Sequence, residues 1–494
     1  MRKFYILFFL LVTMVFANAA TSVEPQVKQV VVNGSYNLRQ PAATVLTILP
    51  FNASTAGRVV LHFDGYCVAD SGDRIVVAAS DDSLWLSNYG NVSVEVANNQ
   101  TRSRSFSHTM VYDIAAGADT FYAVAQNLVD TNGSGHASIY GHLTLEFFPA
   151  TGGAFAIYKN IIANPDFNSG PKVLDKAFAI GGVPNGTVVA HANGWVDSDP
   201  GDRIMLTAGK THSWLVGDGS VAVKALNSAQ RLSPFSHSRM FDAWANDPDS
   251  LFLNAANVVD ASGSGVAWVY GTLTGEYFPS TGIASTDVRE IELDDVPIRA
   301  NPVAFDSITI TAAQAGYVYL QLDGYATTQV GDRIVMAVSD HYGWEPQEGC
   351  VQFAGAYQLN KFNSFSHSRV YPVTAGTHTF YSVAQNVVDT SGNGLLDFAG
   401  NFSLKYYPEA SVGIAEVESG AGFSMFPNPA NNLVTVLLNT GHANQTIELT
   451  DLTGRLLQSI PTGNEQQLQL NLQGLPAGMY LVRCNSATQK LLVE

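Results

Sequence analysis

A motif that recurs at fixed spacing constrains the fold of this chain more than any other feature. The tetrapeptide Gly-Asp-Arg-Ile begins at Gly72, Gly201 and Gly331, at intervals of 129 and 130 residues. The tripeptide Phe-Ser-His follows every copy at one constant distance, and each copy closes on an aromatic residue followed by proline. Self-similarity at a fixed period indicates repetition of one structural unit. The middle of the chain is therefore predicted to hold three related units.

Each unit is predicted to consist of β-strands. Apolar residues alternate with polar ones or form short β-branched runs, and Gly, Asp, Asn and Ser interrupt them every 8–15 residues. This spacing is typical of an all-β sandwich, and no window favours an amphipathic helix. About seven or eight strands per unit favour a jelly roll. The clearest strand segments are 58–63, 75–79, 121–125, 143–148 and 187–192.

The repeats also set the expected domain boundaries. Residues 151–170 and 281–300 precede the second and third copies and are interpreted as linkers or added edge strands. Residues 410–422 are rich in Gly, Ala, Ser and Glu, which is typical of a linker. We expect a signal segment, three β-sandwich repeats, this linker and a small C-terminal domain, at 1–19, 20–150, 151–280, 281–409, 410–422 and 423–494.

Two arrangements of the repeats are open. The one we favour places them as separate beads along the chain. The alternative is a compact pseudo-trimer, in which three units of one chain imitate a homotrimer. Unit size and a turn at 375–377 that leads into an aromatic strand resemble the tumour-necrosis-factor-like jelly rolls, and this resemblance implies the compact arrangement.

The N-terminus has the pattern of a secretory signal peptide. Arg2 and Lys3 precede an apolar run over 4–16, which ends at Ala17-Asn18-Ala19. Thirteen apolar residues form a helix of only ~20 Å, too short for a ~30 Å hydrocarbon core. We therefore expect cleavage after Ala19. No later stretch is apolar for long enough to cross a membrane as a helix, so the mature chain is expected to lack a transmembrane segment.

The C-terminal 72 residues form a different pattern. Short alternating segments, separated by turn residues, predict a small immunoglobulin-like β-sandwich of about seven strands. Its motifs read FPNP, D-x-T-G-R, LPAGMY and a terminal KLLV. The residues that define them include Pro427, Asn428, Pro429, Asp451, Gly454, Arg455, Gly478, Tyr480 and Lys490.

In this order the motifs resemble the type A C-terminal sorting domain of the bacterial type IX secretion system. The resemblance implies a Bacteroidota source, Sec export and then passage through the outer membrane by the type IX machinery. It also implies removal of the domain and a protein that is secreted or held at the outer cell surface. It implies nothing about what the exported part does.

Charge and cysteine content exclude several classes of protein. The chain has 42 Asp and Glu against 25 Lys and Arg, a formal charge of −17. That balance argues against nucleic-acid binding and against a polybasic membrane patch. The three cysteines, Cys67, Cys350 and Cys484, do not occupy equivalent positions. They are interpreted as buried thiols, with a Cys67–Cys350 bridge open only if the first and third units touch.

Two repeated polar features could carry chemistry. The Asp-Arg pair after each repeated glycine is interpreted as a structural turn, and the alternative is an acid–base site. His108, His237 and His367 follow the repeated Phe-Ser and share the inward face of their strands. They are interpreted as core histidines that are hydrogen-bonded by a backbone carbonyl. The alternative is contact with a ligand or metal.

Calcium is a further candidate ligand. Asp197, Asp199 and Asp202 form a run of carboxylates in one loop, and hard oxygen ligands suit Ca²⁺. A second loop, rich in Asp, Asn, Ser and Gly, recurs at 130–135, 260–265 and 389–394 without the spacing of an EF-hand. The alternative to a calcium site is a set of Asx turns. We retain a calcium site as a hypothesis.

The tryptophans supply the candidate ligand contacts. Trp85, Trp214 and Trp344 lie at nearly equivalent positions after the repeated turn, so they could present one aromatic surface per unit. The alternative is that they pack against the core. Trp195, Trp244 and Trp268 complete the six tryptophans.

No motif of an enzyme stands out. H-E-x-x-H, G-x-S-x-G and the P-loop are absent from the sequence. We therefore predict an exported, non-catalytic array of binding or adhesion modules, with glycans or surface proteins as partners, in which three weak sites gain from effective concentration. The alternatives are an enzyme acting on polysaccharide, an accessory protein to such an enzyme, and a structural spacer.

Overall fold

A computed structural model gives the fold of the chain. It describes most of the three repeats and of the C-terminal domain. The described ranges are 25–39, 43–83, 92–95, 103–131, 133–179, 183–210, 221–225, 231–243, 250–280, 285–298, 301–344, 350–354, 362–409, 423–426, 430–438, 446–451, 455–462, 467–476, 478–484 and 487–493. The expected signal peptide at 1–19 and the linker at 410–422 lie outside them.

The first unit is a sandwich of two antiparallel four-stranded sheets, in the orders β1-β8-β3-β6 and β2-β7-β4-β5. The strands are β1 (Gln26–Asn37), β2 (Thr44–Ala53), β3 (Gly57–Ala69), β4 (Arg74–Ser80), β5 (Val92–Glu95), β6 (Ser103–Ile114), β7 (Gly117–Val129) and β8 (His136–Pro149). These two strand orders are those of a jelly roll, because each sheet interleaves strands from both ends of the unit. The predicted all-β fold is therefore confirmed.

The second and third units repeat this topology, with sheet orders β9-β16-β11-β14 and β10-β15-β12-β13, then β17-β24-β19-β22 and β18-β23-β20-β21. The second unit holds β9 (Phe155–Ala163), β10 (Lys172–Ala179), β11 (Gly186–Ser198), β12 (Arg203–Gly209), β13 (Val221–Lys224), β14 (Leu232–Ala243), β15 (Ser250–Val259) and β16 (Ala267–Pro279). The third holds β17 (Ser285–Pro297), β18 (Val303–Ala312), β19 (Gly316–Thr327), β20 (Arg333–Ser339), β21 (Val351–Ala354), β22 (Phe362–Val373), β23 (Gly376–Val388) and β24 (Leu395–Pro408). Strands β9 and β17 lie in the segments left open as linkers or edge strands.

Period-2 alternation explains how each sandwich fills its interior. Along β3, Val59, Leu61 and Phe63 point into the first unit and are fully buried. The intervening residues face the other side of the sheet. In the part of the chain that the structure describes, the one helix is the three-residue 3₁₀ helix η1 (Phe167–Ser169), and no helix is long and apolar enough to cross a membrane.

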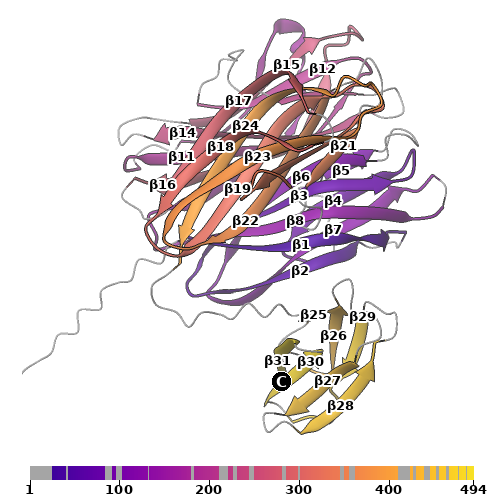
Figure 1. The fold of residues 1–494 in the computed structure, drawn as a ribbon, viewed down its shortest axis with the longest axis vertical. Helices are drawn as coiled ribbons and strands as arrows, with labels where there is room; N and C mark the ends of the chain where they lie inside the picture. The colour runs from indigo at the N-terminus through magenta and orange to yellow at the C-terminus, as the bar shows by residue number, and fades with distance from the viewer. Residues whose placement is uncertain are drawn as a thin grey trace, which may run out of the picture.

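The three units close into a ring. Strand β5 of the first unit packs on β14 of the second, β13 of the second on β22 of the third, and β21 of the third on β6 of the first. Each junction therefore joins the equivalent pair of strands from two neighbouring units. Such a head-to-tail contact is a heterologous interface, and here it closes into a ring after three units. Figure 1 shows the three units gathered into one body. The prediction of separate beads, which was favoured from sequence, is therefore wrong. The three units form the compact pseudo-trimer.

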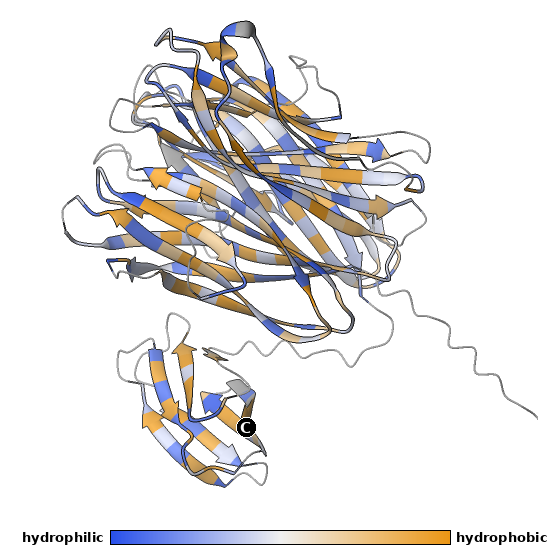
Figure 2. Cartoon of the chain, turned by 180° about the vertical axis from the view of Figure 1, so that it is seen from behind, coloured by the Kyte–Doolittle hydropathy of each residue, from blue (hydrophilic) through white to orange (hydrophobic). Residues whose placement is uncertain are grey.

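The C-terminal domain has its own sandwich, with sheet orders β25-β26-β29 and β28-β27-β30-β31. Its strands are β25 (Phe423–Phe426), β26 (Leu433–Leu438), β27 (Thr446–Asp451), β28 (Leu456–Pro461), β29 (Gln467–Asn471), β30 (Gly478–Cys484) and β31 (Ala487–Val493). Hydrophobic and hydrophilic residues alternate along these strands (Figure 2), and their apolar sides form a separate core.

Candidate functional site

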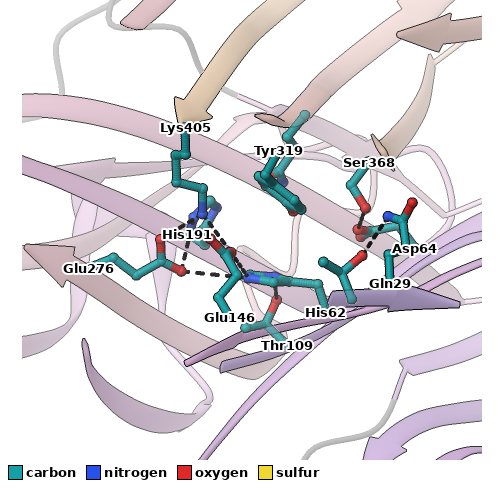
Figure 3. A network of polar contacts seen from close by, with 12 residues as sticks. Gln29, His62, Asp64, Thr109, Glu146, His191, Glu276, Tyr319, Ser368 and Lys405 are labelled. Carbon is teal, nitrogen blue, oxygen red and sulfur yellow. Dashed lines mark hydrogen bonds and ion pairs between the residues drawn. The ribbon is translucent and has the colours of Figure 1, made fainter. Parts of the chain in front are cut away.

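The most unusual chemistry of the described residues is a buried polar network where the three units meet (Figure 3). It lies on the outer faces of the sheets that contain β3, β11 and β19. Each unit contributes one residue from this central strand and one from the neighbouring strand, β8, β16 or β24. The six residues, called the axial network below, are His62, His191, Gln321, Glu146, Glu276 and Lys405.

Lys405 is the centre of the axial network. Its Nζ lies 2.6 Å from Oε1 of Glu146 in the first unit and 2.7 Å from Oε2 of Glu276 in the second. It also lies 4.4 Å from the centre of the Tyr319 ring, close enough for a cation–π contact. All three charged side chains are fully buried. One lysine therefore ties the third unit to the other two.

His62 supplies the second positive charge. Its Nε2 lies 2.8 Å from Glu146 Oε1 and 3.5 Å from Glu276 Oε1. Burial disfavours the imidazolium, but its hydrogen bonds to these two carboxylates, together with their charges, outweigh the effect of burial and raise the pKa of His62 to about 9. Burial lowers the pKa of His191, so that its ring is neutral. Two carboxylates thus face one lysine and one imidazolium, and the network is charge-balanced.

This balance argues against a metal at the same place. His62, His191 and Glu276 are close enough to hold an ion between them. A dication would add two positive charges beside Lys405 and a protonated His62, in a region that water does not reach. The network is also out of reach of a substrate. The two buried glutamates therefore do not form the carboxylate pair of a glycosidase.

A second polar layer joins neighbouring units at three equivalent positions. Asp64 accepts a hydrogen bond of 2.8 Å from the Ser368 hydroxyl, and the Ser238 hydroxyl donates to Asp323. The third member is an amide: Asn193 Oδ1 accepts from the Thr109 backbone N–H at 3.1 Å. Each contact joins a central strand of one unit to the β6, β14 or β22 strand of the next.

The repeated Asp of Gly-Asp-Arg has a structural role in every unit. Asp73 accepts from Asn127 Nδ2 at 3.0 Å and from the backbone N–H of Thr131 at 3.0 Å, which fixes the second repeated loop against the turn. Asp202 and Asp332 bind their own second loops in the same way. The geometry thus matches a structural turn.

The candidate calcium ligands already have protein partners. Arg231 binds Asp197 Oδ1 at 2.6 Å through Nε and Asp199 Oδ1 at 2.9 Å through Nη1. Asp202 is buried and accepts from the second loop. Calcium at these three residues stays a prediction. A melting temperature compared between millimolar calcium and chelator tests it.

The repeated histidines lie in the sandwich interiors. The backbone N–H of Ala79 donates to His108 Nδ1 at 2.9 Å, and His237 and His367 accept equivalent bonds at 3.3 and 3.1 Å. The backbone partner is an N–H rather than a carbonyl, so Nδ1 of each ring is an acceptor. The three cysteines are buried and free, as predicted, and burial raises the pKa of Cys67 and of Cys350 to about 12.

Of the three aligned tryptophans, only Trp344 lies within the described ranges; Trp85 and Trp214 lie outside them, as does Trp244. Trp344 is half-buried against Val335 and Ala337, and its indole N–H donates to Gln385 Oε1 at 2.6 Å. This placement combines packing with partial exposure. A ligand contact at Trp85, Trp214 and Trp344 stays a prediction.

A different group of aromatics lies on the surface of the second unit. Trp195 and Tyr270 stack with ring centres 4.1 Å apart and an angle of 18°, and Trp268 continues the row 5.9 Å from Tyr270 at 17°. Trp268 is 40% exposed. Its partner across the strands is Asp197, which binds Arg231. We call Trp195, Tyr270, Trp268, Asp197 and Arg231 the aromatic platform.

The sorting-domain motifs are partly described. Arg455 Nε lies 3.0 Å from Asp451 Oδ2, and the Tyr480 hydroxyl donates to the Pro476 carbonyl at 2.7 Å. Gly478 begins β30, and the backbone of Lys490 pairs with Leu481. Pro427, Asn428, Pro429 and Gly454 lie outside the described residues.

Residues 424–494 match the family described as "Secretion system C-terminal sorting domain". The sorting domain predicted from its motifs is thereby confirmed. The chain carries a type IX secretion signal. It is therefore an exported protein with a secreted or cell-surface location, and the type IX machinery is its partner.

No curated protein matches the chain. The solved structure of PNGF-II in its P21 crystal form is 8% identical, with a TM-score of 0.22, and the match covers 72% of this chain and 99% of that one. The STIV MCP is 10% identical, with a TM-score of 0.18, coverage being 52% and 96%. Dimeric latent PorU from Porphyromonas gingivalis is 8% identical, with a TM-score of 0.17 and coverage of 97% and 87%. Similarities this low indicate nothing about function.

Proposed function

We propose that the exported part is a non-catalytic binding head that recognises carbohydrate through the aromatic platform. One observation supports this function above all: a row of three stacked aromatic rings ends in Trp268, which is 40% exposed. An exposed indole face suits the apolar face of a sugar ring. Asp197 and Arg231 beside it supply acceptors and donors for hydroxyl groups.

The place of the platform in the fold supports an outward-facing role. It lies at the start of β16, beside Ala267, whereas this strand ends at Pro279. The equivalent strand of the third unit, β24, ends at Pro408, from which the chain continues toward the sorting domain. In the closed ring the platform is therefore at the end away from that connection. A head attached through its C-terminus would present the platform to the surroundings.

A glycan array tests this function. The full exported chain is compared with Trp268→Ala and with Tyr342→Ala, which removes an exposed aromatic from the third unit instead. We expect reproducible binding that Trp268→Ala weakens at least about tenfold, because an aromatic contact at a binding hot spot contributes about 2 kcal/mol or more. Tyr342→Ala is expected to bind as the native protein does. A blank array, or equal loss in both variants, contradicts the proposal.

A further inference from the structure

The ring creates a small pit on its axis, at the end that carries the Gly-Asp-Arg turns. Strands β6, β14 and β22 begin there, and each contributes two successive residues at equivalent positions to the lining: Arg104, Ser105, Ser233, Pro234, Asn363 and Ser364. Lys224 of the second unit also lines it. The cavity volume is about 10 Å³, enough for about one water-sized group. No single unit forms this pit.

Only part of the hydrogen-bonding capacity of the Arg104 guanidinium is satisfied in this pit. Its Nε donates to the carbonyl of Glu95 at 3.3 Å, but Nη2 is buried and has no hydrogen-bond partner in the described part of the chain. Burial lowers the pKa of Arg104 to about 10, and the nearby charge of Glu95 opposes that shift only in part. A buried donor without an acceptor is unfavourable, and more so if it is charged. Nη2 of Arg104 is therefore a donor that an added acceptor can satisfy.

The neighbouring carboxylate, Glu95, offsets the charge of Arg104 only in part. Glu95 Oε2 accepts from the backbone N–H of Leu232 at 3.3 Å, across the junction between the first two units. The residues equivalent to Arg104 are Ser233 and Asn363, so the three-fold pattern is broken by a single guanidinium. Among the described residues that line the pit, Arg104 is therefore the one guanidinium.

We propose that the axial pit binds one small oxyanion, a carboxylate or a sulfate group, through Arg104. Guanidinium N–H groups match the oxygens of such anions and form strong charge-assisted hydrogen bonds with them. Lys224 adds a second positive charge to the lining. Because the cavity holds about one water-sized group, one oxygen of the anion enters it, and the rest of the anion and any attached sugar stay outside. This site differs from the aromatic platform, which suits a neutral sugar face.

Titration calorimetry on the full chain tests the site, with sodium glucuronate, sodium sulfate and neutral glucose as probes at constant ionic strength. We expect one site per chain for glucuronate or sulfate and none of this kind for glucose. Saturation by glucuronate alone assigns a carboxylate, and saturation by sulfate alone assigns a sulfate ester. No saturable binding of either anion overturns the proposal.

Variants separate a binding role from a structural one. Arg104→Gln is expected to weaken anion binding at least tenfold, while Arg104→Lys keeps part of it. Arg289→Gln changes the charge equally at an exposed position of β17 and is expected to have no effect. Without ligand, Arg104→Gln is expected to unfold at the same or a higher temperature, because it removes a buried donor, Nη2, that has no hydrogen-bond partner among the described residues. A lower unfolding temperature with unchanged anion binding makes Arg104 structural and contradicts the site.

Discussion

At the scale of single residues, the axial network shows why the three repeats are not identical. Equivalent positions hold Glu146, Glu276 and Lys405. Three identical charges there would repel one another without water to screen them. One lysine converts this repulsion into two ion pairs. Buried pairs are weak evidence for net stability, but removing one partner leaves an uncompensated buried charge. The network therefore favours a ring that combines two units with a glutamate at this position and one unit with a lysine.

Replacing the central lysine should destabilise the whole ring. Lys405→Met leaves two buried glutamates facing each other, with His62 alone to balance them. We expect a loss of about 3–5 kcal/mol in the free energy of unfolding, measured by urea denaturation. Asp113→Asn is the control, because the Arg58–Asp113 pair is exposed and worth about 0–1 kcal/mol. Equal stability of Lys405→Met and the native chain would show that the network is dispensable.

The axial network also predicts a pH dependence. His62 has a raised pKa of about 9 in the folded state, against about 6.5 when unfolded. Its contribution to stability is therefore complete below pH 6.5 and is lost as the pH rises through 9. The expected fall in unfolding free energy is about 3 kcal/mol, measured by urea denaturation across this range.

A histidine variant assigns that fall to its source. His62→Gln places in the first unit the residue that the third unit has at position 321. It should flatten the decline between pH 6.5 and 9, whereas His136→Gln, at an exposed position, should preserve it. A native protein whose stability is constant over this range contradicts the assigned charge state.

At the scale of elements, close strand contacts position the network. Gly65 pairs with Gly141, Gly194 with Gly271 and Gly324 with Gly400, at one register in all three units. A Cβ on Gly141 would lie 2.1 Å from the Asp64 carbonyl oxygen, which no side chain tolerates. The absence of side chains lets β3 and β8 approach each other next to the layer of Asp64, Asn193 and Asp323.

Adding a methyl group at this register should therefore be costly. We expect Gly141→Ala to lower the unfolding free energy by about 2 kcal/mol or more, because backbone must move to relieve the contact. Gly343→Ala is the control, since its nearest neighbour would be the His341 ring at 3.6 Å. Thermal unfolding compares the two. An alanine tolerated equally at both positions would mean that the strands do not approach as closely as described.

The elements and their inward faces could be predicted from sequence, because period-2 alternation reports which residues fill a sandwich. The outward residues could not. His62 and Glu146 alternate with core residues just as solvent-facing residues would, and only the register of three packed units shows that they are buried. The sequence offered one signal of this burial: position 146 and its equivalents, 276 and 405, hold charges of both signs. Trp268 could not be singled out from the sequence as a ligand contact, because its equivalents are Ser138 and Asp397 and it is not part of a repeated pattern.

At the scale of the whole molecule, ring closure makes one body from three small domains. The junctions repeat the same strand contacts, and an apolar layer beside the axial network draws on all three units. Its members include Val60, Val189 and Tyr319, together with Phe148, Phe278 and Tyr407. A single chain can place different residues at these equivalent positions, which a homotrimer cannot. The sorting domain, with its own core, is added to this body as a separate unit.

Small-angle X-ray scattering of residues 25–409, which contain all strands of the three units, tests the ring most directly. A single compact body of this length has a radius of gyration of about 21 Å. Three separate domains in a row, each of about 14 Å, give more than about 30 Å. The closed ring predicts the smaller value and a globular scattering profile. The larger value, with the profile of an elongated particle, would contradict it.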